Sequence, residues 1–151
     1  MKDHGQVAEE LFREGYNCSQ AVLLAFEDMT GLERETAAKI ASSFGGGLGR
    51  MREVCGAVSG AAMVLGLVRG YFDPKSYEQK KAHYQLIQDF AARFKEKNGS
   101  IICRELLGGV TSPGGIPEQR TPEFYQKRPC ASLIRQATRI VDEMLAQTDA
   151  P

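Results

Sequence analysis

Four cysteines are the side chains of this sequence best suited to do chemistry: Cys18, Cys55, Cys103 and Cys130. Thiolates attack disulfides and oxidants, and they also bind metal ions. Successive cysteines are 37, 48 and 27 positions apart, and no CxxC or CxxCH motif occurs. Local spacing therefore indicates neither a thioredoxin-type dithiol nor a covalently attached haem. Any pair or cluster of these thiols has to be assembled by the fold.

Each cysteine is predicted to lie in the first turn of a helix. Asn17 is a favourable N-cap residue directly before Cys18, and Pro129 stands directly before Cys130. Unpaired backbone N–H groups and the helix dipole make this end of a helix positive, which stabilises a thiolate relative to the thiol. Nearby arginines act in the same direction. They are Arg52 before Cys55, Arg104 after Cys103 and Arg128 before Cys130.

Burial is the competing explanation for each cysteine, because a free cysteine packs as a small hydrophobic residue. Four cysteines at four helix starts favour a shared thiol site over independent burial. Permanent disulfides are rare in a reducing compartment. The roles to test are therefore redox chemistry, metal binding and packing.

A glycine-rich loop, FGGGLGR at 44–50, leads toward Cys55. Its glycines permit positive φ angles and close backbone approach, so the loop could direct Cys55 into a crowded site and leave it accessible. Gly56 and Gly60, four positions apart, leave a smooth helix face where another helix or a cofactor could come close. A nucleotide-binding loop is not indicated, because the dinucleotide glycine spacing is incomplete and no Gly-Lys-Ser/Thr follows.

The rest of the sequence predicts the helices that position the thiols. Apolar residues recur at helical spacing, and neither an alternating strand pattern nor an internal repeat occurs. We therefore expect one all-α domain over 1–151, a compact single-domain bundle of about six helices. The Pro- and Gly-rich stretch 108–129 is predicted to be a long loop. The helices are predicted over 7–15, 18–29, 33–44, 55–68, 73–98 and 130–145, with a short one over 101–109.

The two histidines are weak candidates for a site. His83 falls inside the longest predicted helix, where a structural or surface role is the common one, and His4 lies near a terminus expected to fray. Neither is predicted to anchor a mechanism. The apolar stripe of that longest helix is predicted to contain Tyr77, Tyr84, Ile87, Phe90 and Phe94.

Composition excludes several classes of function. The 151 residues carry 19 basic and 19 acidic side chains, so the net charge is zero and no basic surface for nucleic acid is indicated. The N-terminal segment has no apolar run of the kind found in signal peptides, and the most apolar stretch, 54–68, is too short to span a bilayer. We expect a cytoplasmic protein without a membrane span. The sequence identifies neither a redox partner nor an oligomeric state.

The sequence CGAVSG at 55–60 resembles the CGAxxG motif of the C_GCAxxG_C_C family. Members of that family are described as redox-active proteins of about this length, with one cysteine before the motif and two after it. Cys18 corresponds to the first, and Cys103 and Cys130 correspond to the later pair, so the resemblance covers nearly the whole chain. It implies redox activity through the cysteines without naming a substrate or a reaction.

Three functions follow as hypotheses. In the first, the protein is a thiol-based redox protein in which Cys55 attacks a disulfide or an oxidant and Cys18 resolves the product. The three full pairings of four cysteines remain open. In the second, Cys18, Cys55, Cys103 and Cys130 are ligands of a metal ion or an iron–sulfur cluster. In the third, the protein is a helical interaction module whose cysteines are only packed.

Overall fold

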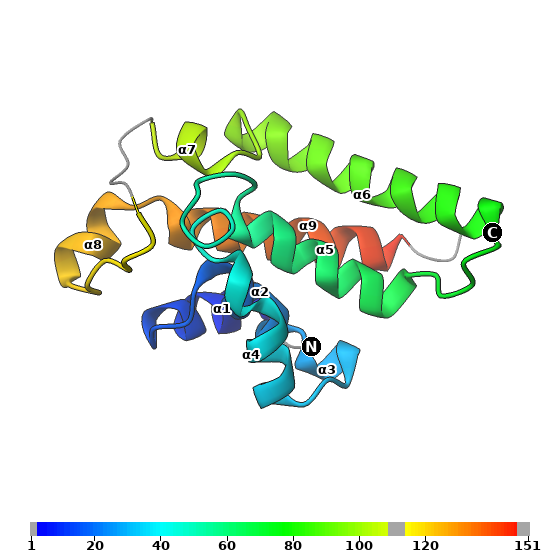
Figure 1. Ribbon diagram of the computed structural model, residues 1–151, viewed down its shortest axis with the longest axis horizontal. Coiled ribbons are helices and arrows are strands. Elements are labelled where there is room, and N and C mark those ends of the chain that lie inside the picture. The colour runs from blue at the N-terminus through cyan, green and yellow to red at the C-terminus, as the bar shows by residue number, and fades with distance from the viewer. Residues whose placement is uncertain (1–2, 109–113, 148–151) are drawn as a thin grey trace.

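The computed structural model describes residues 3–108 and 114–147, and regular structure in these residues is helical apart from one isolated antiparallel bridge between Val54 and Ile102 (Figure 1). The expected all-α architecture is confirmed. The helices are α1 (His4–Arg13), α2 (Cys18–Ala25), α3 (Glu27–Thr30), α4 (Arg34–Ala41), α5 (Gly56–Arg69), α6 (Tyr77–Asn98), α7 (Cys103–Leu106), α8 (Pro122–Lys127) and α9 (Cys130–Ala146), with a short 3-10 turn at Ser42–Phe44.

Helix α2 lies at the centre of the fold. Every side chain from Ala21 to Phe26 is at most 1% exposed, and the helix packs against α1, α4, α5 and α9. Figure 1 shows α6 on one side of α5 and α9, and the helices α1–α4 on the other side. Because α2 is enclosed by other helices, its N-terminal end is held in place by packing as well as by its own cap.

Local sequence determines where α2 and α9 begin. The Asn17 side chain accepts a hydrogen bond from the Gln20 amide at 2.9 Å, and Gln20 Oε1 accepts one from the Asn17 amide at 3.0 Å, which completes a capping box. Pro129 is the N-cap residue of α9, and its carbonyl accepts a hydrogen bond from the Leu133 amide at 3.0 Å. Cys18 and Cys130 are thus the first residues of their helices.

Helix α6 begins and packs differently from the prediction. It starts at Tyr77 because Ser76 caps it, accepting a hydrogen bond from the Gln79 amide at 3.2 Å. Phe90 and Phe94 of the predicted stripe are buried, whereas Tyr77 and Tyr84 are 70% and 53% exposed. The first turns of α6 therefore contribute little to the core, and helical spacing alone overstated the length of the buried face.

The described residues contain more helical segments than the six or so expected. The predicted helix over 18–29 is interrupted at Phe26, which separates α2 from α3. The predicted loop over 108–129 contains α8, which begins where Thr121 accepts a hydrogen bond from the Phe124 amide at 3.2 Å and Pro122 occupies the first turn. An N-cap threonine followed by proline is a helix-start signal, but the surrounding prolines and glycines obscured it. Residues 109–113 of that stretch lie outside the described residues.

His4 is buried, and the prediction of a frayed terminus at this position is wrong. The side chain bridges two carboxylates, with Nδ1 2.8 Å from Asp142 and Nε2 3.0 Å from Asp28. Its ring stacks on Phe26 at a centroid distance of 4.0 Å. These contacts join α1 to α9 and to α3, so His4 has a structural role. His83 lies in α6 with its ring 6.0 Å from that of Tyr71.

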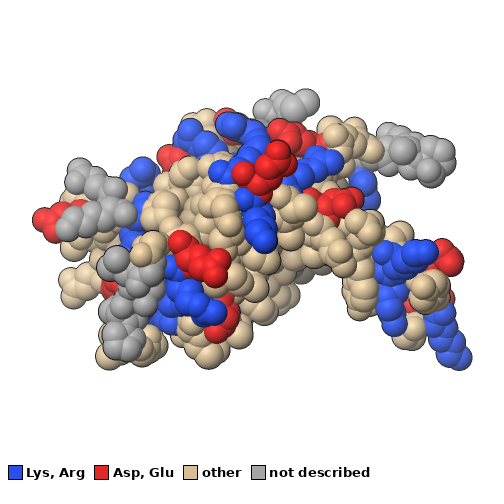
Figure 2. Space-filling model, turned by 90° about the horizontal axis from the view of Figure 1, so that it is seen from above, with Lys and Arg blue, Asp and Glu red and all other residues tan. Residues whose placement is uncertain are grey.

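The surface seen in Figure 2 carries basic and acidic side chains that are interspersed. In the part of the chain that the structure describes, no helix combines the length and the apolar character needed to cross a bilayer. Helix α5, which holds the most apolar stretch of the sequence, has 14 residues.

Candidate functional site

The four cysteines meet at one place in the structure. Cys18, Cys103 and Cys130 are the first residues of α2, α7 and α9, and Cys55 immediately precedes α5. All four are free and line a common cavity of about 40 Å³, termed the cysteine cavity below. The prediction that each cysteine lies at a helix start is confirmed, and the fold brings the four helix starts together.

Backbone hydrogen bonds join the segment before Cys55 to the segment before Cys103. The two residues flank the bridge between Val54 and Ile102. The Cys55 amide donates a hydrogen bond to the Ile101 carbonyl at 2.8 Å, and the Cys103 amide donates one to the Glu53 carbonyl at 2.5 Å. A bridge of a single residue pair leaves no alternating pattern in the sequence, so sequence analysis could not detect it.

The Cys18 and Cys130 thiols line the cysteine cavity together. A side-chain hydrogen bond with Cys18 is the largest influence lowering the pKa of Cys130. Burial opposes the shift, whereas the guanidinium groups of Arg128, Arg120 and Arg52 reinforce it. The same hydrogen bond, followed by burial, raises the pKa of Cys18. Cys130 is therefore the thiol of this pair that ionises first.

Cys55 and Cys103 are more deeply placed, with exposed fractions of 4% and 8%. Burial raises the pKa of Cys55 to about 12, although the backbone N–H groups of Ala57 and Val58 act in the opposite direction. Arg52 Nη1 donates a hydrogen bond to the Cys103 sulfur at 3.8 Å. The sequence had suggested that the glycine loop leaves Cys55 accessible. The structure shows the opposite, because only 4% of Cys55 is exposed.

A larger pocket of about 310 Å³ adjoins the cysteine cavity, and Cys18 and Cys130 line both spaces. Four arginines line this larger pocket, and Glu118 is the one acidic side chain among its described lining residues. The space is termed the arginine pocket below. Its positive charge therefore lines the same pocket as the Cys18 and Cys130 thiols. The four arginines are Arg50, Arg52, Arg120 and Arg128.

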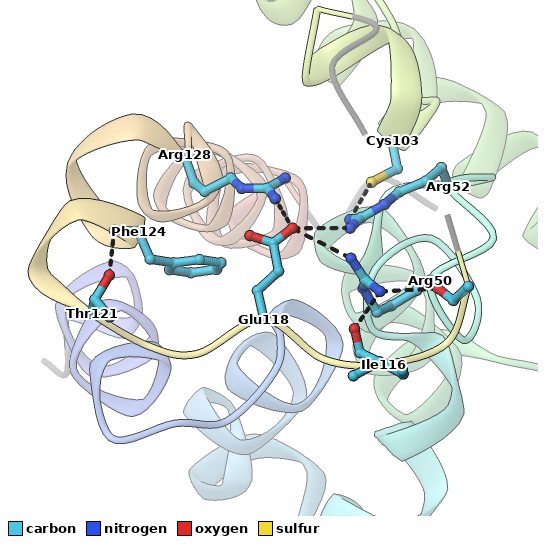
Figure 3. A network of polar contacts seen from close by, with 9 residues as sticks. Arg50, Arg52, Cys103, Ile116, Glu118, Thr121, Phe124 and Arg128 are labelled. Carbon is cyan, nitrogen blue, oxygen red and sulfur yellow. Dashed lines mark hydrogen bonds and ion pairs between the residues drawn. The ribbon is translucent and has the colours of Figure 1, made fainter. Parts of the chain in front are cut away.

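Three of these arginines converge on one oxygen of Glu118 (Figure 3). Arg50 and Arg52 place Nη2 3.3 Å and 3.7 Å from Glu118 Oε1, and Arg128 Nη2 contacts the same oxygen. The hydrogen bond from Arg128, followed by the charges of Arg128, Arg50 and Arg52, lowers the pKa of Glu118. The fourth arginine, Arg120, donates hydrogen bonds to the carbonyl of Phe12 in the last turn of α1 at 2.9 Å and to that of Tyr16 between α1 and α2 at 3.1 Å.

The glycine loop delivers Arg50 and Arg52 along an unusual backbone path. Every residue from 46 to 50 has a positive φ, between 56° and 73°, and Arg52 has a φ of 62°. For a residue with a side chain this conformation costs about 1–2 kcal/mol. A Cβ at Gly47 would lie 2.6 Å from a backbone nitrogen, so glycine is required there. The loop thus aims arginines at the site, although its sequence had suggested that it serves Cys55.

Arg104, the third arginine predicted to stand beside a thiol, takes a different partner. Its Nη1 atom lies 3.2 Å from Glu53 Oε1, and half of the side chain is exposed. Arg50, Arg120 and Glu118 were not identified from the sequence at all. Arg120 and Glu118 lie ten or more positions from any cysteine, and Arg50 is five positions from Cys55 but belongs to no known thiol motif. Only their position in the fold connects these three residues to the site.

A metal site requires several donor side chains that converge on one point. Among residues 3–108 and 114–147, no group of three or more His, Cys, Asp or Glu side chains has the arrangement needed to hold a metal ion. Cys18, Cys55, Cys103 and Cys130 remain the ligand set of that hypothesis, and Gly56 and Gly60 remain the positions predicted to accept a cofactor.

A family model described as "Putative redox-active protein (C_GCAxxG_C_C)" matches residues 16–144 of the chain. The protein belongs to the C_GCAxxG_C_C family. Comparisons with curated proteins and with solved structures found no match. The description of the family thus names redox activity.

In this C_GCAxxG_C_C protein, the CGAVSG motif consists of Cys55, which is the N-cap residue of α5, and the first five residues of α5. The motif packs against the first turn of α2. A Cβ at Gly56 would lie 3.1 Å from Cys18 Cβ, and a Cβ at Gly60 would lie 2.7 Å from the Ser19 carbonyl oxygen. The predicted close approach of another helix is confirmed. Both glycines thereby bring Cys18 up to the cysteine cavity.

We expect Gly60→Ala to destabilise the protein by about 1–3 kcal/mol, because the added methyl group would push α2 away from α5. Gly66→Ala in the same helix is the matched control. Its Cβ would meet nothing within 4 Å, so we expect a gain of about 0.5–1 kcal/mol from helix propensity. Urea unfolding of the two variants measures both values. Equal effects of the two substitutions would contradict the close approach.

Proposed function

We propose that this protein carries out two-electron thiol–disulfide chemistry, with Cys130 as the attacking thiolate and Cys18 as the resolving thiol. The observation that carries the proposal is that the Cys18 and Cys130 thiols together line both the cysteine cavity and the wall of the arginine pocket. The membership of a redox-active family supports the same class of chemistry.

The reaction begins when the Cys130 thiolate attacks one sulfur of a disulfide RS–SR. A Cys130–SR bond forms, the RS–SR bond breaks, and one RS⁻ leaves. Cys18 then loses its proton, and its sulfur attacks the Cys130 sulfur and releases the second RS⁻. The protein loses two electrons and gains a Cys18–Cys130 disulfide. The substrate RS–SR gains those two electrons. The two RS⁻ products take up one proton from Cys18 and one from solvent.

Cys130 suits the attacking role better than Cys55, which the sequence had favoured. An attacking thiol has to be ionised near neutral pH and has to be reached by the disulfide. Cys130 has a lowered pKa and lines the 310 Å³ pocket, whereas Cys55 is 4% exposed and has a pKa raised to about 12. Cys55 and Cys103 then act as buried neighbours of the reacting pair.

The alternatives predict different thiol and metal contents. We expect anaerobically purified protein to show four titratable thiols and to lose two of them reversibly when treated with bis(2-hydroxyethyl) disulfide. Peptide mass mapping should then place the new disulfide between Cys18 and Cys130. Metal analysis of the same preparation is the control: stoichiometric zinc or iron that protects all four thiols would overturn the dithiol mechanism in favour of a metal or iron–sulfur centre. Four thiols that do not react would favour the interaction module with packed cysteines.

A further inference from the structure

The arginine pocket holds more positive charge than its single acidic side chain neutralises. Its described lining residues include four arginines and one glutamate, a formal excess of three positive charges. The side chains of Arg50 and Arg52 are each 11% exposed, and that of Arg128 is 16% exposed. Arg50 also donates hydrogen bonds to the Gly114 and Ile116 carbonyls, but these neutral acceptors do not balance its charge. Planar guanidinium groups can each hold a whole carboxylate by themselves. Three of them here share one oxygen of Glu118.

Glu118 is a partner that could be displaced. It lies in the segment between α7 and α8, outside any helix, and its side chain is 34% exposed, which is two to three times the value of the arginines around it. The arginines are held more firmly. Arg52 extends from a loop closed by the hydrogen bond between its own amide and the Gly46 carbonyl at 3.0 Å, and Arg128 is the C-cap residue of α8, where its amide donates a hydrogen bond to the Phe124 carbonyl at 3.1 Å.

The position of the charges relative to the sulfurs indicates what they could bind. Arg52, which contacts Glu118, also donates a hydrogen bond to the Cys103 sulfur, and Cys130 lines the same pocket. A carboxylate bound where Glu118 lies would therefore occupy the same pocket as the reacting thiol. A volume of about 310 Å³ is at the small end of the range for small-molecule sites, and Phe12 and Phe124 add apolar walls.

We propose that the arginine pocket binds a small disulfide that carries carboxylate groups, and that Glu118 occupies the carboxylate position when no ligand is bound. This inference rests on the proposed function and specifies its substrate class. The ligand carboxylate replaces Glu118 against Arg50, Arg52 and Arg128, and its disulfide faces Cys130. The exchange then follows the two steps given above, and the released product is a pair of small anionic thiols.

Three small disulfides that differ in charge test the assignment on the full-length reduced protein. They are 3,3′-dithiodipropionate with two carboxylates, bis(2-hydroxyethyl) disulfide without charge, and cystamine with two ammonium groups. Each rate is divided by the rate of the same disulfide with free 2-mercaptoethanol, which removes intrinsic differences in reactivity. We expect the normalised rate of the dianion to exceed that of the neutral disulfide at least about tenfold, and that of the dication to be the lowest. Added salt should reduce the differences between the three normalised rates.

Variants identify the groups responsible. Arg50→Gln should lower the ratio of the dianion rate to the neutral rate several-fold, because one of the three guanidinium groups is lost. Glu118→Gln should raise the ratio, because the competing carboxylate is removed. Lys81→Gln, which removes one positive charge from an exposed position of α6, is the matched control and should leave the ratio unchanged.

The outcomes separate the substrate assignment from the proposed function. If the three disulfides react at equal normalised rates and still produce the Cys18–Cys130 disulfide, the substrate assignment is overturned and the dithiol mechanism stands. A charge preference that neither Arg50→Gln nor Glu118→Gln changes would also overturn the assignment to this pocket. If none of the three compounds produces the Cys18–Cys130 disulfide, the proposed function itself fails.

Discussion

Replacement of Cys130 by serine should lower the rate of reaction with bis(2-hydroxyethyl) disulfide by about 100-fold or more, to the background given by the other thiols. A serine hydroxyl is not ionised near neutral pH and does not attack a disulfide, so the first bond of the exchange cannot form. The remaining thiols do not compensate, because Cys55 and Cys103 are only 4% and 8% exposed and burial still raises the pKa of Cys18 once Cys130 is gone. Stopped-flow measurement of 2-mercaptoethanol release gives the rate.

Cys55→Ser is the matched control for this experiment, because it removes a buried thiol of the same cavity. We expect this variant to keep a rate within a few-fold of the wild-type rate. The reverse pattern, with activity lost in Cys55→Ser and kept in Cys130→Ser, would restore the original expectation that Cys55 attacks and would refute the assignment to Cys130.

The second large effect concerns pH. The rate of alkylation of Cys130 by iodoacetamide should follow its thiolate fraction and reach half of its maximum below the ordinary thiol value of 9.0, because the pKa is lowered. Cys18→Ala removes the donor of the hydrogen bond that lowers this pKa most, so the midpoint should move to higher pH and the rate near pH 7 should fall several-fold. The titratable and charged groups around Cys130 are the thiols of Cys18, Cys55 and Cys103 and the guanidinium groups of Arg128, Arg120 and Arg52.

Cys18→Ser separates this electrostatic role from the resolving role. A serine hydroxyl can still donate a hydrogen bond to the Cys130 thiolate, so the midpoint should stay closer to that of the wild type. Both variants should stop at the mixed disulfide, because neither has a thiol to release the second RS⁻. A midpoint that Cys18→Ala leaves in place would contradict the hydrogen bond as the cause of the low pKa.

Local sequence was sufficient to place the thiols on their helices. The Asn17–Gln20 capping box and the proline before Cys130 act within four residues of the cysteines that they position, so both helix starts could be read directly. Helix α8 was missed although it has a local start signal, and the other errors arose where distant packing decides the outcome. The exposure of Tyr77 and Tyr84 on α6 depends on how far the other helices extend, which helical spacing does not report.

The sequence identified the thiols of the candidate site, but neither their roles nor most of the charged residues around them. The sequence predicted all four cysteines as site candidates, and it indicated Arg52 and Arg128 as neighbours of thiols. It also linked the glycine loop to access for Cys55, whereas the positive φ angles of that loop direct Arg50 and Arg52 into the arginine pocket. Glu118 carried no signal, because its importance comes entirely from the three guanidinium groups around it.

By itself, the sequence determined that this protein is helical and that its four cysteines occupy the positive ends of helices, because capping residues and apolar spacing act over a few positions. Only the tertiary structure decided which thiols touch, which are buried and which stand beside arginines. The pKa and accessibility of a thiol depend on desolvation and on charges a few ångströms away in space. Cys18 and Cys130, more than a hundred positions apart in the chain, become such neighbours only when the helices pack.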